Sequence, residues 1–206
     1  MSFPVHRLVI SMHSGFFDRL CKSGFKESGE RKVDLSEDPT AAVCLMISYF
    51  YTFTYCWDDD TLTGLPANTY GPRFYGWAWF LIHAQVLVLA DKYDIKGLGS
   101  LAIDQFKNHV EQILAADVAS ATIRAAAADL IEATRYVYQN ATESGAVLRQ
   151  LIISAFQDKQ YRLLRYATRT EFEGLLSDVP DFATEYIDAL TGITVGSKRP
   201  KSSKGS

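Results

Sequence analysis

The chain has 206 residues, of which 48% are hydrophobic and 22% are charged, and its formal net charge is -3. This composition supports a buried core, and the slight negative charge excludes an overall basic field for nucleic acid or for an acidic membrane surface. The longest apolar run, residues 77–90, has 14 residues and includes His83, whereas a membrane span needs about 20. We therefore expect no nucleic-acid partner and no membrane partner.

Short elements are predicted at the start of the chain. Residues 5–10 are apolar and β-branched, which predicts the end of a strand or a strand-to-helix junction. Ser14 can cap a short helix over residues 14–20 that carries Phe17 on its inner face. Residues 33–35 alternate apolar and polar side chains, which is typical of a short strand.

A longer helix follows, and then a loop. Asp38 can cap the helix, and Pro39 suits its first position because the missing N–H is not needed there. The apolar stripe of this helix predicts an end near Thr52. Residues 56–76 contain three consecutive aspartates, two prolines and several glycines, so we expect a long surface loop.

The remainder of the chain is predicted to be helical. Helices are expected over 77–93 and 98–110, with Gly97 stopping the chain between them. Capping residues predict further helix starts at Asp117, at Ser144, at Thr170 with Glu173 as a capping box, and at 178–180. Gly192 is expected to end the last helix. Residues 193–206 are rich in Lys, Ser and Gly and predict a disordered basic tail.

The side chains that carry chemistry do not form a recognisable site in the sequence. The four histidines lack the spacing of a helical metal site, and no cysteine pair has CxxC spacing. Residues 58–60 could ligate Mg²⁺, but a solvated turn is the favoured interpretation. We expect no enzyme activity, no cofactor, no metal and no small-molecule substrate.

Location is predicted from the cysteines and the first residues. Cys21, Cys44 and Cys56 have no disulfide-type spacing, and His6 and Arg7 interrupt any signal-peptide core. Reduced thiols then predict a cytoplasmic or nuclear protein. In the tail, Lys198, Arg199 and Lys201 form a candidate nuclear import signal, although a solubilising end is the favoured interpretation.

The order of short motifs resembles that of a BTB/POZ domain of the fungal type, over residues 3–112. The motifs are 5–10, Ser14 with Phe17, 25–28, 33–35, Asp38 with Pro39, 49–52 with Tyr55, 83–86 and 89–98. The positions that carry the fold motif are Val5, His6, Ser14, Phe17, Tyr49, Tyr51, Ala90 and Tyr93. Their favoured interpretation is core packing and not a chemical site.

The resemblance implies a fold class and a domain order. It implies an α+β, predominantly α-helical protein, in which a truncated BTB/POZ fold is a helical cluster with a remnant small sheet. A helical extension would follow at 113–192. The family's N-terminal β-hairpin has no counterpart here, so we expect either a truncated sequence or a second chain that completes the sheet, and self-association through this region is in doubt.

The resemblance also implies protein partners. Many members of the family are adaptors that dock on a cullin scaffold of a ubiquitin ligase through a hydrophobic residue, any residue, then Glu. Phe25 and Glu27 match that pattern, and Phe25 would be a desolvated anchor. The alternative is that Phe25 packs into its own core. A second hypothesis is a self-associating nuclear scaffold or transcriptional co-regulator, supported by the basic tail.

Overall fold

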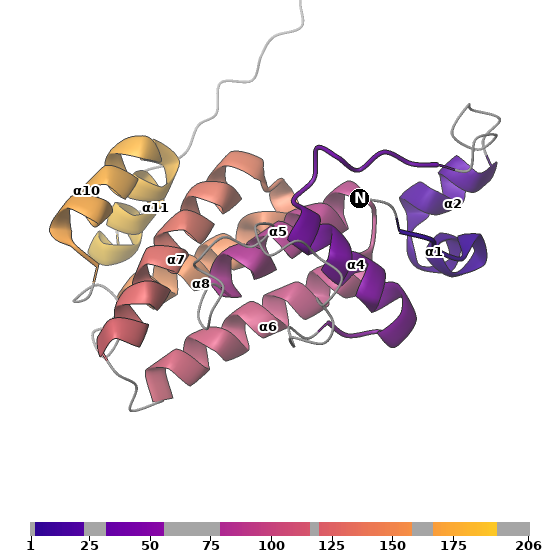
Figure 1. Ribbon diagram of the computed structural model, residues 1–206. Coiled ribbons are helices and arrows are strands. Elements are labelled where there is room, and N and C mark those ends of the chain that lie inside the picture. Colours follow the sequence, from indigo (N-terminus) through magenta and orange to yellow (C-terminus); the bar gives the residue numbers. More distant parts are fainter. Residues whose placement is uncertain (1–2, 23–31, 56–78, 116–119, 158–166, 193–206) are drawn as a thin grey trace, which may run out of the picture.

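The structure is a computed structural model that describes residues 3–22, 32–55, 79–115, 120–157 and 167–192. Regular structure in these ranges is helical (Figure 1), which confirms the predominantly helical fold class. The helices in chain order are α1 (Arg7–His13), α2 (Gly15–Lys22), α4 (Thr40–Thr52), α5 (Trp79–Lys92), α6 (Lys96–Ala115), α7 (Ser120–Asn140), the 3-10 turn η2 (Glu143–Gly145), α8 (Ala146–Gln157), α10 (Arg169–Asp178) and α11 (Pro180–Thr191).

Helix α5 is the centre of the fold. It packs against α4, α6 and α7, and its apolar residues point to all of them. A helix that is hydrophobic all round must be buried on all sides. Its buried residues are Phe80, Ile82, His83, Ala84, Val86, Leu87, Leu89 and Ala90.

A side chain of the second half caps α5. The Asp129 carboxylate, on α7, accepts hydrogen bonds from the backbone N–H groups of Phe80 at 2.7 Å and Leu81 at 3.3 Å. These groups belong to the first turn of α5, where N–H groups have no partner within the helix and negative charge is favourable. Asp129 thus joins the two halves of the chain.

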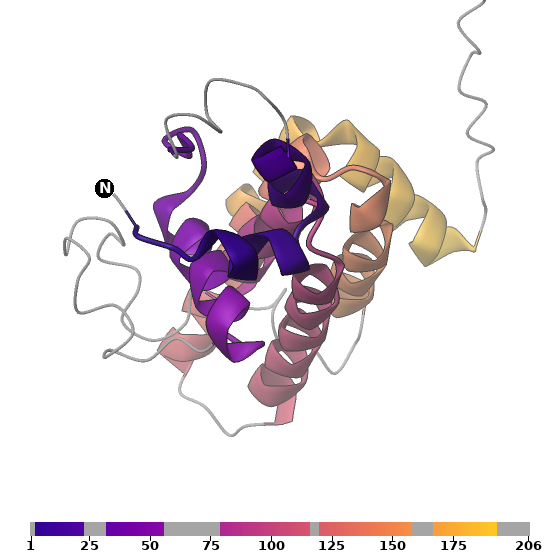
Figure 2. The ribbon, with the colours of Figure 1, turned by 90° about the vertical axis from the view of Figure 1, so that its right-hand side faces the viewer.

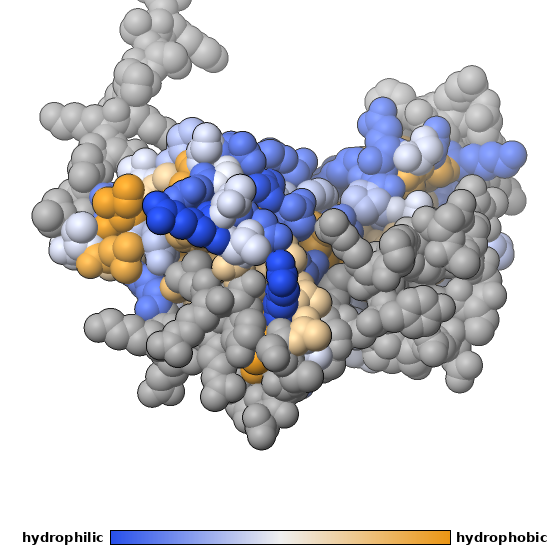
Figure 3. Space-filling model, turned by 60° about the vertical axis from the view of Figure 1, so that its left-hand side comes forward, coloured by the Kyte–Doolittle hydropathy of each residue, from blue (hydrophilic) through white to orange (hydrophobic). Residues whose placement is uncertain are grey.

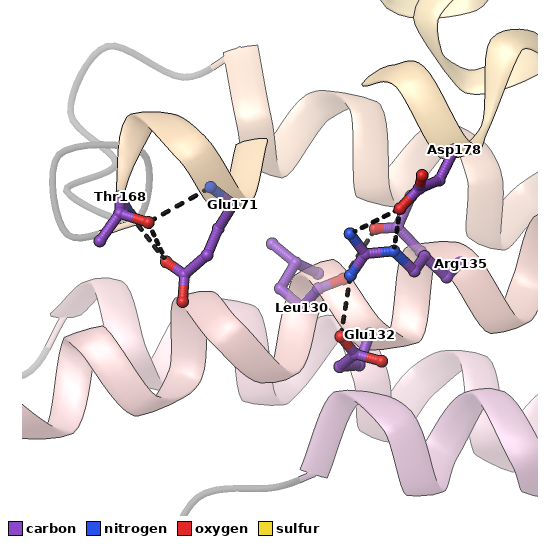
Figure 4. Close-up of polar contacts among 7 residues, drawn as sticks. Leu130, Glu132, Arg135, Thr168, Glu171 and Asp178 are labelled. Carbon is purple, nitrogen blue, oxygen red and sulfur yellow. Dashed lines mark hydrogen bonds and ion pairs between the residues drawn. The ribbon is translucent and has the colours of Figure 1, made fainter. Parts of the chain in front are cut away.

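The C-terminal helices α10 and α11 pack on α7 and α8 through aromatic rings. Phe182 is fully buried, and its ring contacts those of Tyr138, Phe156 and Tyr186 at centroid distances of 5.5–5.6 Å. Figure 4 shows the polar rim of this contact, where Arg135 on α7 binds Asp178 at 3.1 Å. The apolar rings form the interior of the contact and the charges lie at its edge.

Helices α1 and α2 are attached through the turn that follows α5. The buried Ser14 hydroxyl donates to the Tyr93 carbonyl at 2.5 Å and accepts from the Phe17 N–H at 3.1 Å. The Gly15 N–H donates to the Asp94 carbonyl, and a Cβ at Gly15 would lie 2.0 Å from the Asp94 carboxylate. The predicted capping by Ser14 is confirmed, and the close approach explains the glycine beside it.

The predicted strand at 33–35 is wrong, and of the two alternatives for residues 5–10 the strand-to-helix junction fits, because His6 has extended backbone and α1 begins at Arg7. Residues 7–10 belong to helix α1, and residues 33–35 are irregular. No strand occurs in the ranges given above, so the remnant sheet of the predicted fold is not formed there. The short alternating pattern at 33–35 is too brief to form a sheet without a paired neighbour.

Three predicted helix signals are also wrong. Asp38 makes no cap, because its carboxylate accepts from the Lys92 ammonium at 2.6 Å and from the Tyr93 hydroxyl at 2.5 Å. Gly97 does not stop a helix but lies inside α6. The capping box pairs Thr168 with Glu171, as Figure 4 shows, and not Thr170 with Glu173.

Two helix ends agree with expectation, at Thr52 for α4 and before Gly192 for α11. The predicted domain boundary at 112/113 falls inside α6, and the division into domains stays a prediction. Of the helices described, none combines the length and the apolar character needed to cross a lipid bilayer. The predicted loop at 56–76 and the tail at 193–206 lie outside the described residues.

Candidate protein-docking surface

Exposed apolar side chains gather at the end of the molecule formed by α1 and the C-terminus of α4. In the described ranges, six of the nine exposed large apolar residues lie there, and the rest are Val147, Ile187 and Leu190. The six are Val5, Leu8, Met12, Val33, Tyr51 and Phe53. Figure 2 brings this side of the molecule forward. Apolar patches on a protein surface mark contact sites when they are contiguous.

The outer surface of α1 carries Leu8 and Met12, which together with Val5, two residues before the helix, we call the α1 apolar face. Leu8 is 72% exposed and Met12 is 70% exposed. They are four residues apart, so they lie on one side of the helix. Ile10 is buried beneath them. The helix therefore has an apolar side toward the core and a second apolar side toward solvent.

Phe53 extends this surface from the end of α4. It is 62% exposed and adopts a left-handed conformation with φ 58°. That conformation costs a bulky residue roughly 1–3 kcal/mol and is often found at functional sites. The ring of Phe53 lies edge-on against His13 of α1, at a centroid distance of 5.0 Å. The strained turn thus places an aromatic ring at the docking surface.

Tyr51 ties the start of α1 to α4. Its hydroxyl accepts a hydrogen bond from the His6 N–H at 2.8 Å and lies 3.1 Å from the His6 ring Nδ1. The sequence placed Tyr51 in the nucleus of the fold, but 43% of the residue is exposed. Of the other predicted fold-motif residues, Val5 and His6 are exposed and do not pack in the core, while Ser14, Phe17, Tyr49, Ala90 and Tyr93 are buried.

A groove opens beside the α1 apolar face, with a volume of about 970 Å³. Its floor is apolar and its mouth carries Val5 and Val33 together with Arg7, Lys32 and Asp34. Arg7 donates a hydrogen bond to the Cys21 carbonyl. The floor is formed by Ile10, Phe17, Val43, Met46, Ile47 and Phe50. This groove is large enough to hold part of another molecule.

A polar cluster is buried inside the fold, away from the α1 apolar face. The Tyr55 hydroxyl lies 2.9 Å from His83 Nδ1, and the rings of His83 and His109 are 6.3 Å apart. Burial lowers the pKa of His83 to about 3, helped by neighbouring His109, and lowers that of His109 to about 4. Both rings are neutral at pH 7. In the described residues, no group of three or more possible metal ligands exists.

The predicted partner residues Phe25 and Glu27 lie outside the described residues, as do Lys198, Arg199 and Lys201 of the candidate import signal. The structure brings forward Leu8, Met12 and Phe53, which the sequence analysis missed. The i, i+4 spacing of Leu8 and Met12 could have revealed the α1 apolar face if a helix had been predicted over residues 7–13. Nothing in the sequence indicated the strained turn at Phe53.

The opposite end of the molecule has less exposed apolar surface. Ile187 and Leu190 lie on the outer side of α11. Figure 3 shows the side that carries α10 and α11, where a small apolar area lies among mainly hydrophilic side chains. The α1 end therefore remains the stronger candidate for docking.

Comparison with known proteins finds a family model that matches the first part of the chain. Residues 1–65 match the family model of the BTB/POZ domain, which is a non-enzymatic protein–protein interaction module. The match covers α1, α2 and α4 and confirms the predicted resemblance for this part of the chain. No curated protein and no solved structure matches the chain.

Proposed function

We propose that the chain is a docking module that binds another protein through its α1 end, on the basis of the match of residues 1–65 to the BTB/POZ domain. The observation that carries the proposal is the α1 apolar face, where Leu8 and Met12 point to solvent. Full burial of one such side chain contributes about 1.5–3 kcal/mol. Leu8 and Met12 together supply enough to form the energetic centre of an interface.

The finer proposal is an adaptor for a cullin-based ubiquitin ligase. It is supported by Phe25 and Glu27, which have the spacing that such adaptors use, and by their place in the chain directly after α2. A buried Phe would supply apolar contact area, and Glu27 would fix the orientation by a charged hydrogen bond. The cullin and the recruited substrate would then bind different parts of the chain.

The test is direct binding of a purified cullin N-terminal domain, measured by calorimetry. We expect the Phe25→Ala, Glu27→Ala double variant to lose at least tenfold in affinity. The matched control is Lys26→Ala, Ser28→Ala, which changes the same segment and should bind as the unaltered chain does. Equal affinity of all three proteins would remove the adaptor function.

The second candidate is a self-associating nuclear scaffold or co-regulator. The exposure of both Leu8 and Met12 on one side of α1 favours it, because two copies could bury these residues against each other. Sedimentation equilibrium of the unaltered chain and of Leu8→Asp tests self-association, and a dimer that Leu8→Asp dissociates is expected. A monomer at all concentrations would reject the scaffold, and unchanged cell location after Lys198→Ala, Arg199→Ala, Lys201→Ala would reject the import signal.

A further inference from the structure

We propose that the groove beside α1 binds an extended segment of a partner protein, which pairs as a β-strand with residues 32–35. The inference rests on the proposed protein-binding function and names the kind of ligand. It differs from docking on the α1 apolar face, because the binding groups are backbone amides and the floor of a groove. Three features of the described residues carry it.

The first feature is an unpaired stretch of backbone. Residues 32–35 are irregular, and Figure 1 shows them as a stretched connection between α2 and α4. Among the described residues, the Leu35 carbonyl accepts from the Asp38 N–H, and the Ser36 N–H donates to the Asp34 carboxylate. The N–H and carbonyl groups of Val33 have no backbone partner there. Such an edge is a template for strand addition.

The second feature is the position of this stretch on the rim of the groove. Residues 32–36 all line it, and so do buried residues of α2 and α4 such as Phe17, Val43 and Phe50. An added strand would turn alternate side chains toward this apolar floor and the others toward solvent. A volume of about 970 Å³ is also near the upper end for small-molecule sites. The unpaired backbone favours a peptide over a small molecule as the ligand.

The third feature is charge. Arg7 and Lys32 lie at the groove and form no ion pair in the described part of the chain, whereas Asp34, the acidic residue among the groove residues, already accepts from Ser36. The rim therefore has a positive surplus. A strand whose solvent-facing positions include Asp or Glu would complement it. The ligand is an extended segment with alternating apolar and acidic residues, supplied by another protein.

The experiment selects random eight-residue peptides, displayed on phage, on the full chain. Enrichment of alternating apolar and acidic residues is expected. Enrichment of an apolar i, i+3, i+4 pattern, or no enrichment, would overturn the inference. Neither result touches the proposed function, which depends on Leu8, Met12 and Phe25 and is tested with separate variants.

The selected peptide is then titrated into the chain and into Val33→Pro and Asp34→Pro. Neighbouring amides of a strand point to opposite sides, so one proline should weaken binding at least tenfold and the other should not. Amide exchange at Val33 or Asp34 should slow on saturation. The proposal would be overturned by equal affinity of both variants, or by tight binding of the same peptide with N-methylated amides. It would also be overturned if amide protection appeared with rising chain concentration alone, because a second copy of the chain would then occupy the groove.

Discussion

Gly97 and Gly99 lie two residues apart in α6 but meet different neighbours. A Cβ at Gly97 would lie 2.2 Å from the hydroxyl oxygen of the buried Tyr49, whereas a Cβ at Gly99 would make ordinary contacts with Leu87 at 3.6 Å and Ala90 at 3.7 Å. Alanine in a helix is better than glycine by about 0.5–1 kcal/mol. We expect Gly99→Ala to raise the free energy of unfolding and Gly97→Ala to lower it, in urea denaturation. Changes of the same sign would contradict this packing.

His83 and His109 make the stability depend on pH. Their pKa values of about 3 and about 4 lie below the ordinary 6.5, so the unfolded chain binds more protons than the folded one in mild acid. Stability is therefore lost as pH falls below about 6.5, by up to about 1.4 kcal/mol per pH unit for each histidine, until the folded pKa is reached.

The measurement for this pair is urea denaturation at pH 7 and pH 5. Between pH 7 and pH 5, we expect the free energy of unfolding to fall by less in the double variant His83→Gln, His109→Gln than in the unaltered chain. The carboxylates contribute the same pH dependence in both proteins, so the difference reports on the histidines. An equal fall in the two proteins would show that the histidines ionise freely in the fold.

At the scale of elements, Asp129 decides how α5 begins. Asp129→Ala would leave the N–H groups of Phe80 and Leu81 without this carboxylate, and each lost hydrogen bond to a charged group costs about 1.5–3 kcal/mol. We expect a loss of stability of at least this size, since two such bonds are lost, with faster amide exchange at Phe80 and Leu81. Asp104→Ala, an exposed change on α6, is the control and should alter neither quantity.

The C-terminal pair α10 and α11 is held by rings more than by charges. Phe182→Ala should cost about 3–5 kcal/mol, the usual range for a buried Phe. Arg135→Ala, Asp178→Ala should cost at most about 1 kcal/mol, because the ion pair is partly exposed. Thermal unfolding of both variants tests which contact contributes more to stability. A larger loss of stability in the ion-pair variant than in Phe182→Ala would contradict the prediction.

The sequence predicted elements well where their ends are set by neighbouring residues. Pro180 begins α11 and Gly192 ends it with φ 69°, which are local effects. It failed where a distant group competes: Asp38 can cap a helix in isolation, but Lys92 and Tyr93 hold its carboxylate. Glycine is required at position 97 because a Cβ there would collide with Tyr49, and the turn between α5 and α6 contains Asp94 with φ 53°. The α1 apolar face was missed because residues 5–10 were interpreted as the end of a strand or a strand-to-helix junction, and not as part of a helix that also contains Met12.

At the scale of the whole molecule, the two ends have different surfaces. The α10–α11 end uses its large aromatic rings to pack on α7 and α8, and few apolar residues remain outside. The α1 end exposes Leu8, Met12 and Phe53 although a core lies directly beneath them. Helix α1 packs on α2 and α4, and α4 packs in turn on α5, so a partner bound at α1 would contact a surface joined to the centre of the fold through α4.

The most direct test of docking through α1 compares two surface variants in affinity capture with quantitative mass spectrometry. Leu8→Asp, Met12→Asp alters the α1 apolar face, and Ile187→Asp, Leu190→Asp makes the same change on α11. With both variants shown to be folded by their unfolding curves, we expect the first to lose the specific partners of the unaltered chain and the second to keep them. Retention by the first and loss by the second would contradict the account.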